Sequence, residues 1–366
     1  MILDFGSQYT QLIARRVREN HVFSQIAPYN IKASEISEIA PRGLILSGGP
    51  SSVYEKKSPL PDENIFKLGI PILGICYGMQ AISIMFGGKV KIAPRREYGK
   101  AELFIDDASD LFYRLPGNIT SWMSHQDKVI KLPKGFRSIA HTLNTTCAAL
   151  SDKRRKIYGV QFHPEVIHTP KGNDILANFL FKICGCARRW TLSSFVSEAV
   201  ENIRKSVGKN KVICGLSGGV DSSVTAMLIH KAIGKKLRCI FIDNGLLRKD
   251  EGAQVKMIFK DTMRFNLGYV EAEDRFLRRI DGITDPEQKR KLIGDEFVKI
   301  FEEEARKFKS VEFLAQGTLY PDVIESSPAF GGPSAVIKTH HNVGGLPIDM
   351  KLKLIEPLRE LFKDEV

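Results

Sequence analysis

The stretch GIPILGI, residues 69–75, constrains the fold of this chain more than any other segment. Its apolar residues do not alternate with polar ones, so a strand formed here would be buried on both faces. Strands of that kind occur in parallel sheets that carry helices on both sides. The run leads into GICYG (74–78), whose two glycines predict a sharp turn directly after the strand.

The same order of apolar strand, glycine turn and helical pattern recurs in both halves of the chain. RGLILSGGP (42–50) is one example, and KVICGLSGG (211–219) is another. This alternation predicts an α/β protein of two doubly wound domains, each with a mainly parallel sheet covered by helices. GCARRW (185–190) marks the expected boundary between a domain over residues 1–186 and a second over 190–366.

Composition and charge limit the classes of function that are open to the chain. Lys and Arg total 54 and Asp and Glu total 42, a formal net charge of +12 that suits an anionic ligand. The basic residues are scattered and form no repeat with aromatic ones, so we expect no nucleic-acid partner. No apolar run approaches the roughly 20 residues of a membrane helix, and the first ten residues do not read as a signal peptide, so we expect no membrane association. The six cysteines form no C-x-x-C pair, which favours reduced thiols and a cytoplasmic location.

Cys76 is the first candidate catalytic residue. Its flanking glycines permit the strained strand-to-helix turn of a nucleophile elbow, with cysteine in place of serine. Such a turn exposes the sulfur at the carboxyl edge of the sheet, beside a helix N-terminus that favours the thiolate. An inert core cysteine is the commoner interpretation of an isolated cysteine. The two glycines and the apolar strand ahead of them outweigh that interpretation.

A thiol nucleophile requires a base and a group that orients the base. QFHPEV (161–166) supplies both, because His163 and Glu165 are two residues apart and point to the same side of an extended segment. We expect His163 to deprotonate Cys76, and Glu165 to fix the imidazole tautomer. The glycines of SGGP (47–50) offer backbone N–H groups to a developing oxyanion, although an ordinary tight turn explains them equally well.

A second candidate site is SGGVDSS (217–223), which follows an apolar strand and opens a helix, the setting of an anion-binding loop. Its glycines let the backbone approach an anion closely, and Asp221 is a candidate Mg²⁺ ligand. The loop lacks the G-x-x-x-x-G-K-[ST] pattern, so simple γ-phosphate transfer is not indicated. A flexible glycine–serine turn is the alternative. The candidate phosphate-binding residues are Ser217, Gly218, Gly219, Val220, Asp221, Ser222 and Ser223.

The motifs of the first half resemble, in sequence and in order, the class I glutamine amidotransferase domain, which hydrolyses glutamine to glutamate and ammonia. The resemblance covers roughly residues 1–186 and implies a triad of Cys76, His163 and Glu165. It also implies that the amides of Gly49 and Tyr77 form the oxyanion hole. The glutamine contacts that it implies are Gln80, Ser124, His125, Gln126 and Asp127.

The loop at 217–223 resembles the pyrophosphate loop of ATP pyrophosphatases, and the segments around it resemble the glutamine-hydrolysing GMP synthase family. These segments are FIDNGLLRKDE (241–251), TDPEQKRKLIGDEF (284–297), AQGTLYPDVIES (315–326) and IKTHHNVGGLP (337–347). The resemblance implies that ATP adenylates the C2 oxygen of xanthosine 5′-monophosphate (XMP), and that ammonia then displaces AMP to give GMP. It places Ile242 at the adenine and Gly317 and Lys338 at the phosphates, with Mg²⁺ accompanying ATP and no tightly bound organic cofactor.

That family continues into a C-terminal domain that forms a homodimer and helps to bind the nucleotide. Because this sequence ends at Val366, we expect it to lack that domain, to hydrolyse glutamine and to make little or no GMP. Because the C-terminal domain forms the homodimer of the family, we do not expect this sequence to form that homodimer. Two alternatives stay open: another amidotransferase or a tRNA-modifying enzyme with the same loop, and an inactive relative with a binding role. The intact triad weighs against inactivity, and the lack of cysteines for sulfur relay weighs against tRNA thiolation.

Overall fold

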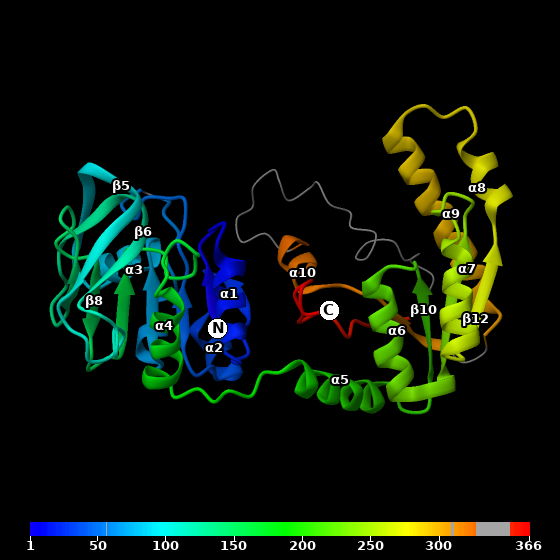
Figure 1. Cartoon of the computed structure of the whole chain (residues 1–366), viewed down its shortest axis with the longest axis horizontal. Helices are drawn as coiled ribbons and strands as arrows, with labels where there is room; N and C mark the ends of the chain where they lie inside the picture. Colours follow the sequence, from blue (N-terminus) through cyan, green and yellow to red (C-terminus); the bar gives the residue numbers. More distant parts are fainter. Residues whose placement is uncertain (56, 309–310, 327–351) are drawn as a thin grey trace. The chain divides into compact units, whose positions relative to one another are not determined.

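The computed structural model describes residues 1–55, 57–308, 311–326 and 352–366. They form two compact units, the first over residues 1–190 and the second from Thr191 onward (Figure 1). Each unit has its own sheet, and helices pack on both sheets, so the predicted α/β class is confirmed. In these ranges no helix is long and apolar enough to cross a membrane.

The first unit is built on a nine-stranded sheet in the order β2-β1-β3-β4-β9-β8-β7-β5-β6. The five neighbouring strands β2, β1, β3, β4 and β9 are parallel, as predicted. The other four, β8, β7, β5 and β6, extend the sheet with antiparallel pairing. The strands are β1 (Ile2–Asp4), β2 (Ile26–Pro28), β3 (Leu44–Leu46), β4 (Ile72–Ile75), β5 (Lys89–Ile105), β6 (Asn118–Lys131), β7 (Arg137–His141), β8 (Ala149–Asp152) and β9 (Ile157–Val160). The helices are α1 (Thr10–Glu19), α2 (Ala33–Ile39), η1 (Glu63–Lys67), α3 (Tyr77–Met85), α4 (Gly172–Ala177) and the π-helix η2 (Asn178–Ile183).

Three of the parallel strands bring distant parts of the sequence to one edge of the sheet. β4 lies between β3 and β9, with Leu46 opposite Gly74 and Ile75 opposite Val160. All four residues of β4 are buried, as the unbroken apolar run predicts, and α3 packs across β3, β4 and β9. Because parallel strands end at the same edge, the segments that follow these three strands meet there.

The antiparallel extension follows a different pattern of burial. Along β6, buried residues alternate with half-exposed or exposed ones, so one face of this strand packs inward and the other does not. β5 and β6 pair over most of their length, with Glu97 opposite His125 and Tyr98 opposite Ser124. This pairing brings the segment 124–127 beside the parallel strands.

Two helix ends are closed by well-defined caps. Gly87 adopts φ +82° after α3, and the N–H of Gly88 donates to the Ser83 carbonyl at 2.7 Å, which closes the helix as a glycine C-cap. Asp285 Oδ1 accepts from the Gln288 N–H at 2.7 Å and caps the N-terminus of α9 (Pro286–Arg306). Thr191 caps the N-terminus of α5 (Leu192–Val207), because its Oγ1 accepts the N–H of Ser194.

The second unit contains a five-stranded parallel sheet in the order β12-β11-β10-β13-β14. β10 has β11 on one side and β13 on the other, so the chain reverses its winding direction at β10, where open α/β sheets bind ligands. The strands are β10 (Lys211–Leu216), β11 (Leu237–Asp243), β12 (Leu267–Glu271), β13 (Val311–Ala315) and β14 (Lys353–Ile355). The helices are α5 (Leu192–Val207), α6 (Val220–Ile233), η3 (Gly234–Lys236), α7 (Glu251–Val255), η4 (Lys256–Thr262), α8 (Glu273–Ile280), α9 (Pro286–Arg306) and α10 (Tyr320–Ser326).

Candidate active site

Cys76 occupies a strained turn between β4 and α3. Its backbone adopts φ 51° and ψ −104°, a conformation that is rare for a residue with a side chain. The Cys76 N–H donates to the Val160 carbonyl of β9 at 2.7 Å, which anchors the turn to the neighbouring strand. Strain of this kind persists only where the surrounding structure enforces it, and it is typical of nucleophile elbows.

The two glycines of G-x-C-x-G are required by close backbone packing. A Cβ at Gly74 would lie 2.5 Å from the Gly78 carbonyl carbon, and a Cβ at Gly78 would lie 2.3 Å from the Leu46 carbonyl oxygen. Both separations are far below van der Waals contact. The glycines therefore let β3, β4 and the first turn of α3 approach closely enough to form the elbow.

His163 and Glu165 follow β9 and lie at the same edge. His163 Nδ1 is 2.7 Å from Glu165 Oε1, and both side chains are buried. A carboxylate oxygen accepts, so Nδ1 carries a hydrogen and Nε2 is left to exchange a proton with Cys76. Burial disfavours the charged imidazole, but hydrogen bonds with Cys76 and Glu165 outweigh it and hold the pKa of His163 well above its usual value. The imidazole can therefore retain the proton that the Cys76 thiol gives up.

Contacts from several elements fix this dyad. The His163 N–H donates to the Trp122 carbonyl at 3.0 Å, and Thr169 Oγ1 donates to the His163 carbonyl at 2.7 Å. Arg16 Nε donates to the Glu165 carbonyl at 2.9 Å. Glu165 Oε2 is buried and has no hydrogen-bond partner within the described ranges. The hydrogen bond that this carboxylate makes there is the one between Oε1 and His163.

The SGGP segment follows β3 and lies against the same site. A Cβ at Gly48 would lie 3.3 Å from His163 Cε1, and a Cβ at Gly49 would lie 2.8 Å from the Phe5 carbonyl oxygen. The turn is therefore closely packed, whereas an ordinary surface turn has free space around its backbone. Tyr77 is the first residue of α3, so its N–H has no acceptor within the helix.

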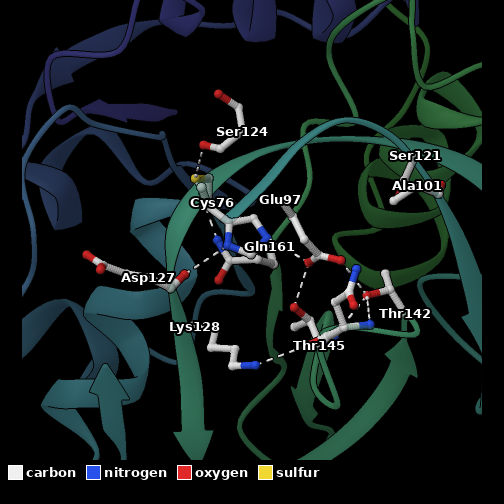
Figure 2. Close-up of polar contacts among 12 residues, drawn as sticks. Cys76, Glu97, Ala101, Ser121, Ser124, Asp127, Lys128, Thr142, Thr145 and Gln161 are labelled. Atoms are coloured by element: carbon white, nitrogen blue, oxygen red, sulfur yellow. Dashed lines mark hydrogen bonds and ion pairs between the residues drawn. The ribbon is translucent and has the colours of Figure 1, made fainter. Parts of the chain in front are cut away.

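Gln161, which the sequence reasoning did not select, contacts Cys76, the predicted nucleophile. Its Nε2 donates to Cys76 Sγ at 3.7 Å, and its side chain is fully buried (Figure 2). Gln80, a predicted glutamine contact, is also buried, and its Nε2 donates to the Asp127 carbonyl and to Gln161 Oε1. Alternation along an extended segment places Gln161 on the same side as His163, a signal by which it could have been found.

The predicted glutamine-binding segment 124–127 divides into two faces of β6. Ser124 and Gln126 are half-buried, whereas His125 and Asp127 are buried. Ser124 presents its carbonyl to Cys76 Sγ at 3.9 Å (Figure 2). Ser52 Oγ donates to Asp127 Oδ2 at 2.7 Å, and the Tyr54 hydroxyl to Oδ1 at 2.9 Å, so both carboxylate oxygens of Asp127 are engaged.

The second predicted site forms an exposed loop between β10 and α6. Residues 217–220 are all exposed, and Gly218 adopts φ +77°, a left-handed conformation that favours glycine. Hydroxyl groups brace the turn: Ser222 Oγ lies 3.0 Å from Ser217 Oγ, and Ser223 Oγ donates to the Gly219 carbonyl at 2.7 Å. A glycine turn at a helix N-terminus, open to solvent, suits an anionic ligand.

Three other predicted phosphate or adenine contacts have different outcomes. A Cβ at Gly317 would lie 3.2 Å from the backbone of Asp221, so Gly317 packs directly against the loop. Ile242 is buried in a hydrophobic cluster with Ala272 and Phe276, and its role at the adenine stays a prediction. Lys338 lies outside the described residues.

Lys363 is a further residue at the loop that the sequence reasoning missed. Its Nζ forms an ion pair with Asp221 Oδ1 at 2.5 Å, although the two residues are 142 positions apart. The side chain of Lys363 is 58% exposed and that of Asp221 is 32% exposed, so both remain accessible to a ligand. No local pattern marks Lys363, because only the fold brings it to the loop.

The fold, the cysteine elbow and the histidine–glutamate dyad define the first unit as a class I glutamine amidotransferase domain. The family model for Glutamine amidotransferase class-I matches residues 1–183, and the model for NAD synthase matches residues 192–273. Two curated proteins called GMP synthase [glutamine-hydrolyzing] match all of this chain. The protein from Acetivibrio thermocellus is 57% identical and that from Clostridium perfringens 55%, and the chain spans 71% of each. The chain belongs to the family of glutamine-hydrolysing GMP synthases. A solved structure of a putative GMP synthase subunit from Thermoplasma acidophilum is 37% identical, with a TM-score of 0.47, over 50% of this chain and 92% of that one.

Proposed function

We propose that this protein carries out the reaction of its family, which makes GMP from XMP, ATP and glutamine; that residues 1–366 by themselves make little or no GMP stays a prediction. Glutamine is hydrolysed in the first unit, and XMP is adenylated in the second. The observation that carries the proposal is the convergence of Cys76 and the His163–Glu165 dyad at the ends of adjacent strands β4 and β9. An exposed pyrophosphate-type loop in the second unit and membership of the GMP synthase family support it.

The first reaction is acyl transfer through the Cys76 sulfur. The thiol proton passes to His163 Nε2, and the sulfur attacks the side-chain carbonyl carbon of glutamine. The N–H groups of Gly49 and Tyr77 stabilise the oxyanion, the C–N bond breaks, and His163 returns its proton to the departing nitrogen as ammonia. Water then hydrolyses the thioester, which releases glutamate and restores the thiol.

The glutamine contacts are assigned on the two faces of β6. Ser124 and Gln126 are half-buried, and their side chains are assigned to the glutamine molecule. Gln80, His125 and Asp127 are engaged within the protein, and they hold the segment 124–127 in place around the substrate. This arrangement separates groups that bind glutamine from groups that keep the binding strand rigid.

The second reaction occurs at the loop 217–223. The C2 oxygen of XMP attacks the α-phosphorus of ATP and pyrophosphate leaves, and ammonia then displaces AMP at C2 to give GMP. Because an amide oxygen is a poor leaving group, adenylation makes the substitution feasible at neutral pH. Ser217, Ser222 and Ser223 and the backbone of the loop bind the departing pyrophosphate.

The residues at the loop fit a magnesium ion that accompanies ATP. Mg²⁺ in nucleotide sites takes one or two carboxylates together with substrate phosphates, and Asp221 provides one partly exposed carboxylate there. Asp221 would hold the ion, which neutralises charge on the phosphates when it is bound. Lys363 lies beside that carboxylate and can contribute a second positive charge.

The cellular setting that we propose is the cytoplasm. All six cysteines are free, and the mechanism needs Cys76 as a thiol. We include no nucleic acid among the partners, since glutamine, ATP and XMP account for both sites.

The proposal is tested by glutamate release from glutamine. We expect the wild-type protein to release glutamate, with a rate that rises when ATP and XMP are present, and Cys76→Ala to release none above background. Formation of GMP is followed in the same reactions by chromatography of the nucleotides. Wild-type protein that releases no glutamate with all substrates present, or a Cys76→Ala variant as active as wild type, would contradict it.

A further inference from the structure

A chain of buried side-chain amides runs from β6 to the Cys76 sulfur. Gln80 Nε2 donates to the Asp127 carbonyl at 2.9 Å and to Gln161 Oε1 at 3.2 Å. Gln161 Nε2 donates to Cys76 Sγ at 3.7 Å. Gln80 is 3% exposed and Gln161 is fully buried, so water cannot replace these contacts freely.

The chemistry of the partners determines which end of each amide faces which neighbour. The Asp127 backbone carbonyl can only accept, so the end of Gln80 that faces it must be the NH₂ group. The second hydrogen of that NH₂ points at Gln161, which must therefore present its carbonyl oxygen to Gln80. It follows that the NH₂ group of Gln161, and not its oxygen, faces the sulfur.

We propose that Gln161 is a further catalytic residue of the glutaminase: its amide donates a hydrogen bond to the Cys76 sulfur, and Gln80 holds the amide in that orientation. The inference rests on the proposed glutaminase function and deepens it. A neutral donor stabilises the thiolate by a hydrogen bond without a formal charge, so less nucleophilicity is lost than beside a second cation.

Two other groups beside the sulfur, among the residues that the structure describes, do not supply this contact. The Ser124 carbonyl, 3.9 Å from Sγ, can only accept, so it suits the thiol and not the thiolate. His163 is the charged partner of the sulfur, but it must give its proton to the departing nitrogen during the reaction. The Gln161 amide does not titrate between about pH 4 and pH 10, so it stays a donor both before the sulfur attacks and when the sulfur leaves the thioester.

Alkylation of Cys76 by iodoacetamide tests the proposal without glutamine. Residues 68–89 form one tryptic peptide, between Lys67 and Lys89, in which Cys76 is the single cysteine, so mass spectrometry follows this thiol alone. For Gln161→Leu we expect alkylation about fivefold slower at pH 6 than in wild type, with the rates converging above pH 9. Gln161→Glu, nearly equal in shape, should be slower still, because its carboxylate repels the thiolate.

Gln80→Leu and Asn178→Leu complete the set. Gln80→Leu leaves Gln161 in place but removes the bond that orients it, and we expect a rate between those of wild type and Gln161→Leu. Asn178 donates two amide hydrogen bonds in the same unit, to the Leu111 and Tyr113 carbonyls, so Asn178→Leu removes comparable bonds without touching the sulfur. Its alkylation profile should match wild type, and circular dichroism verifies the fold of each variant.

The outcomes separate this inference from the proposed function. Wild-type profiles in both Gln161 variants, or an equal shift in Asn178→Leu, would overturn the role of Gln161. If Gln161→Leu does not fold, the result for Gln161→Glu or, failing that, for Gln80→Leu decides. Wild-type protein that hydrolyses no glutamine with ATP and XMP would refute the glutaminase, yet the alkylation profiles would still report whether Gln161 contacts the thiolate.

Discussion

Glu97 illustrates how a single buried charge supports the site. It lies opposite His125 across β5 and β6, with His125 Nε2 3.2 Å from Glu97 Oε2. Thr145 Oγ1 donates to Oε2 at 2.6 Å and Thr142 Oγ1 to Oε1 at 2.8 Å. Burial opposes the charge, but His125 and the two threonines outweigh it and lower the pKa of Glu97 to about 2. This cluster, of which Figure 2 labels Glu97, Thr142 and Thr145, fixes the segment 124–127 through His125.

Glu97→Gln should therefore make stability depend less on pH. A carboxyl whose pKa is lowered on folding, here from 4.5 to about 2, stabilises the fold above the unfolded value and loses that contribution as the pH falls through about 2. We expect the variant to be about 3 kcal/mol less stable than wild type at pH 7, with the gap shrinking between about pH 5 and pH 2. Urea unfolding at several pH values measures it.

Glu102→Gln is the matched control on the same strand. Glu102 is exposed and accepts one hydrogen bond, from Asn118 Nδ2 at 2.7 Å. Its replacement should change stability by less than about 0.5 kcal/mol. A gap for Glu97→Gln that does not vary with pH would show that burial, not ionisation, determines the contribution of this residue.

At the scale of elements, the elbow depends on how closely one strand and one helix approach each other. Leu46 of β3 presents its carbonyl oxygen where a side chain at Gly78 would begin. The positive φ of Cys76 is held by this packing and by the bond from its N–H to Val160. Local sequence thus creates the turn, and two neighbouring strands keep it strained.

Gly78→Ala should disrupt the elbow while leaving most of the sheet intact. The added methyl would lie 2.3 Å from the Leu46 carbonyl oxygen, so α3 must move away from β3. We expect a loss of about 1–3 kcal/mol of stability from overpacking and a decrease in glutaminase rate of about 100-fold from displacement of the sulfur. Gly117→Ala serves as the control, because a Cβ there meets nothing within 4 Å. Equal glutaminase rates in the two variants would contradict this account of the turn.

At the scale of the whole molecule, the two chemistries belong to two units with separate cores. One buried cluster of the first unit includes Leu46, Tyr77 and Met79, whereas Ile242 and Phe276 belong to a cluster of the second. Each reactive loop follows a strand of its own sheet. The intermediate that the units share in the proposed reaction is ammonia, which can also be supplied from solution.

Ammonium salts should therefore bypass a defect in the first unit but not in the second. With XMP, ATP and ammonium, we expect Cys76→Ala in a full-length enzyme of this family to release AMP at a rate near that of wild type, because ammonia no longer has to come from glutamine. Asp221→Ala should release AMP at least about tenfold more slowly, since it loses the carboxylate assigned to Mg²⁺. A coupled enzymatic assay of AMP measures the release rates of both variants. If ammonium rescued the two variants alike, the proposed division between the units would be wrong.

Much of this architecture could be predicted because it follows from local patterns. The unbroken apolar run at 72–75 predicts a strand that is covered on both faces, and the glycines around Cys76 predict the turn that follows it. Spacing alone placed His163 and Glu165 on one side of an extended segment. The antiparallel extension was not predicted, because burial on one face depends on which strands pair and no local signal specifies the partner.

Local sequence specifies the turns, the alternation of strands and helices, and the candidate nucleophile, because backbone freedom and side-chain periodicity act over a few residues. Tertiary structure alone decided that β3, β4 and β9 are neighbours and that Gln161 meets Cys76 from 85 positions away. It also decided that Glu97 is buried with His125 and that Lys363 reaches Asp221. Such contacts arise from strand order and register, which are selected by the packing of the whole core.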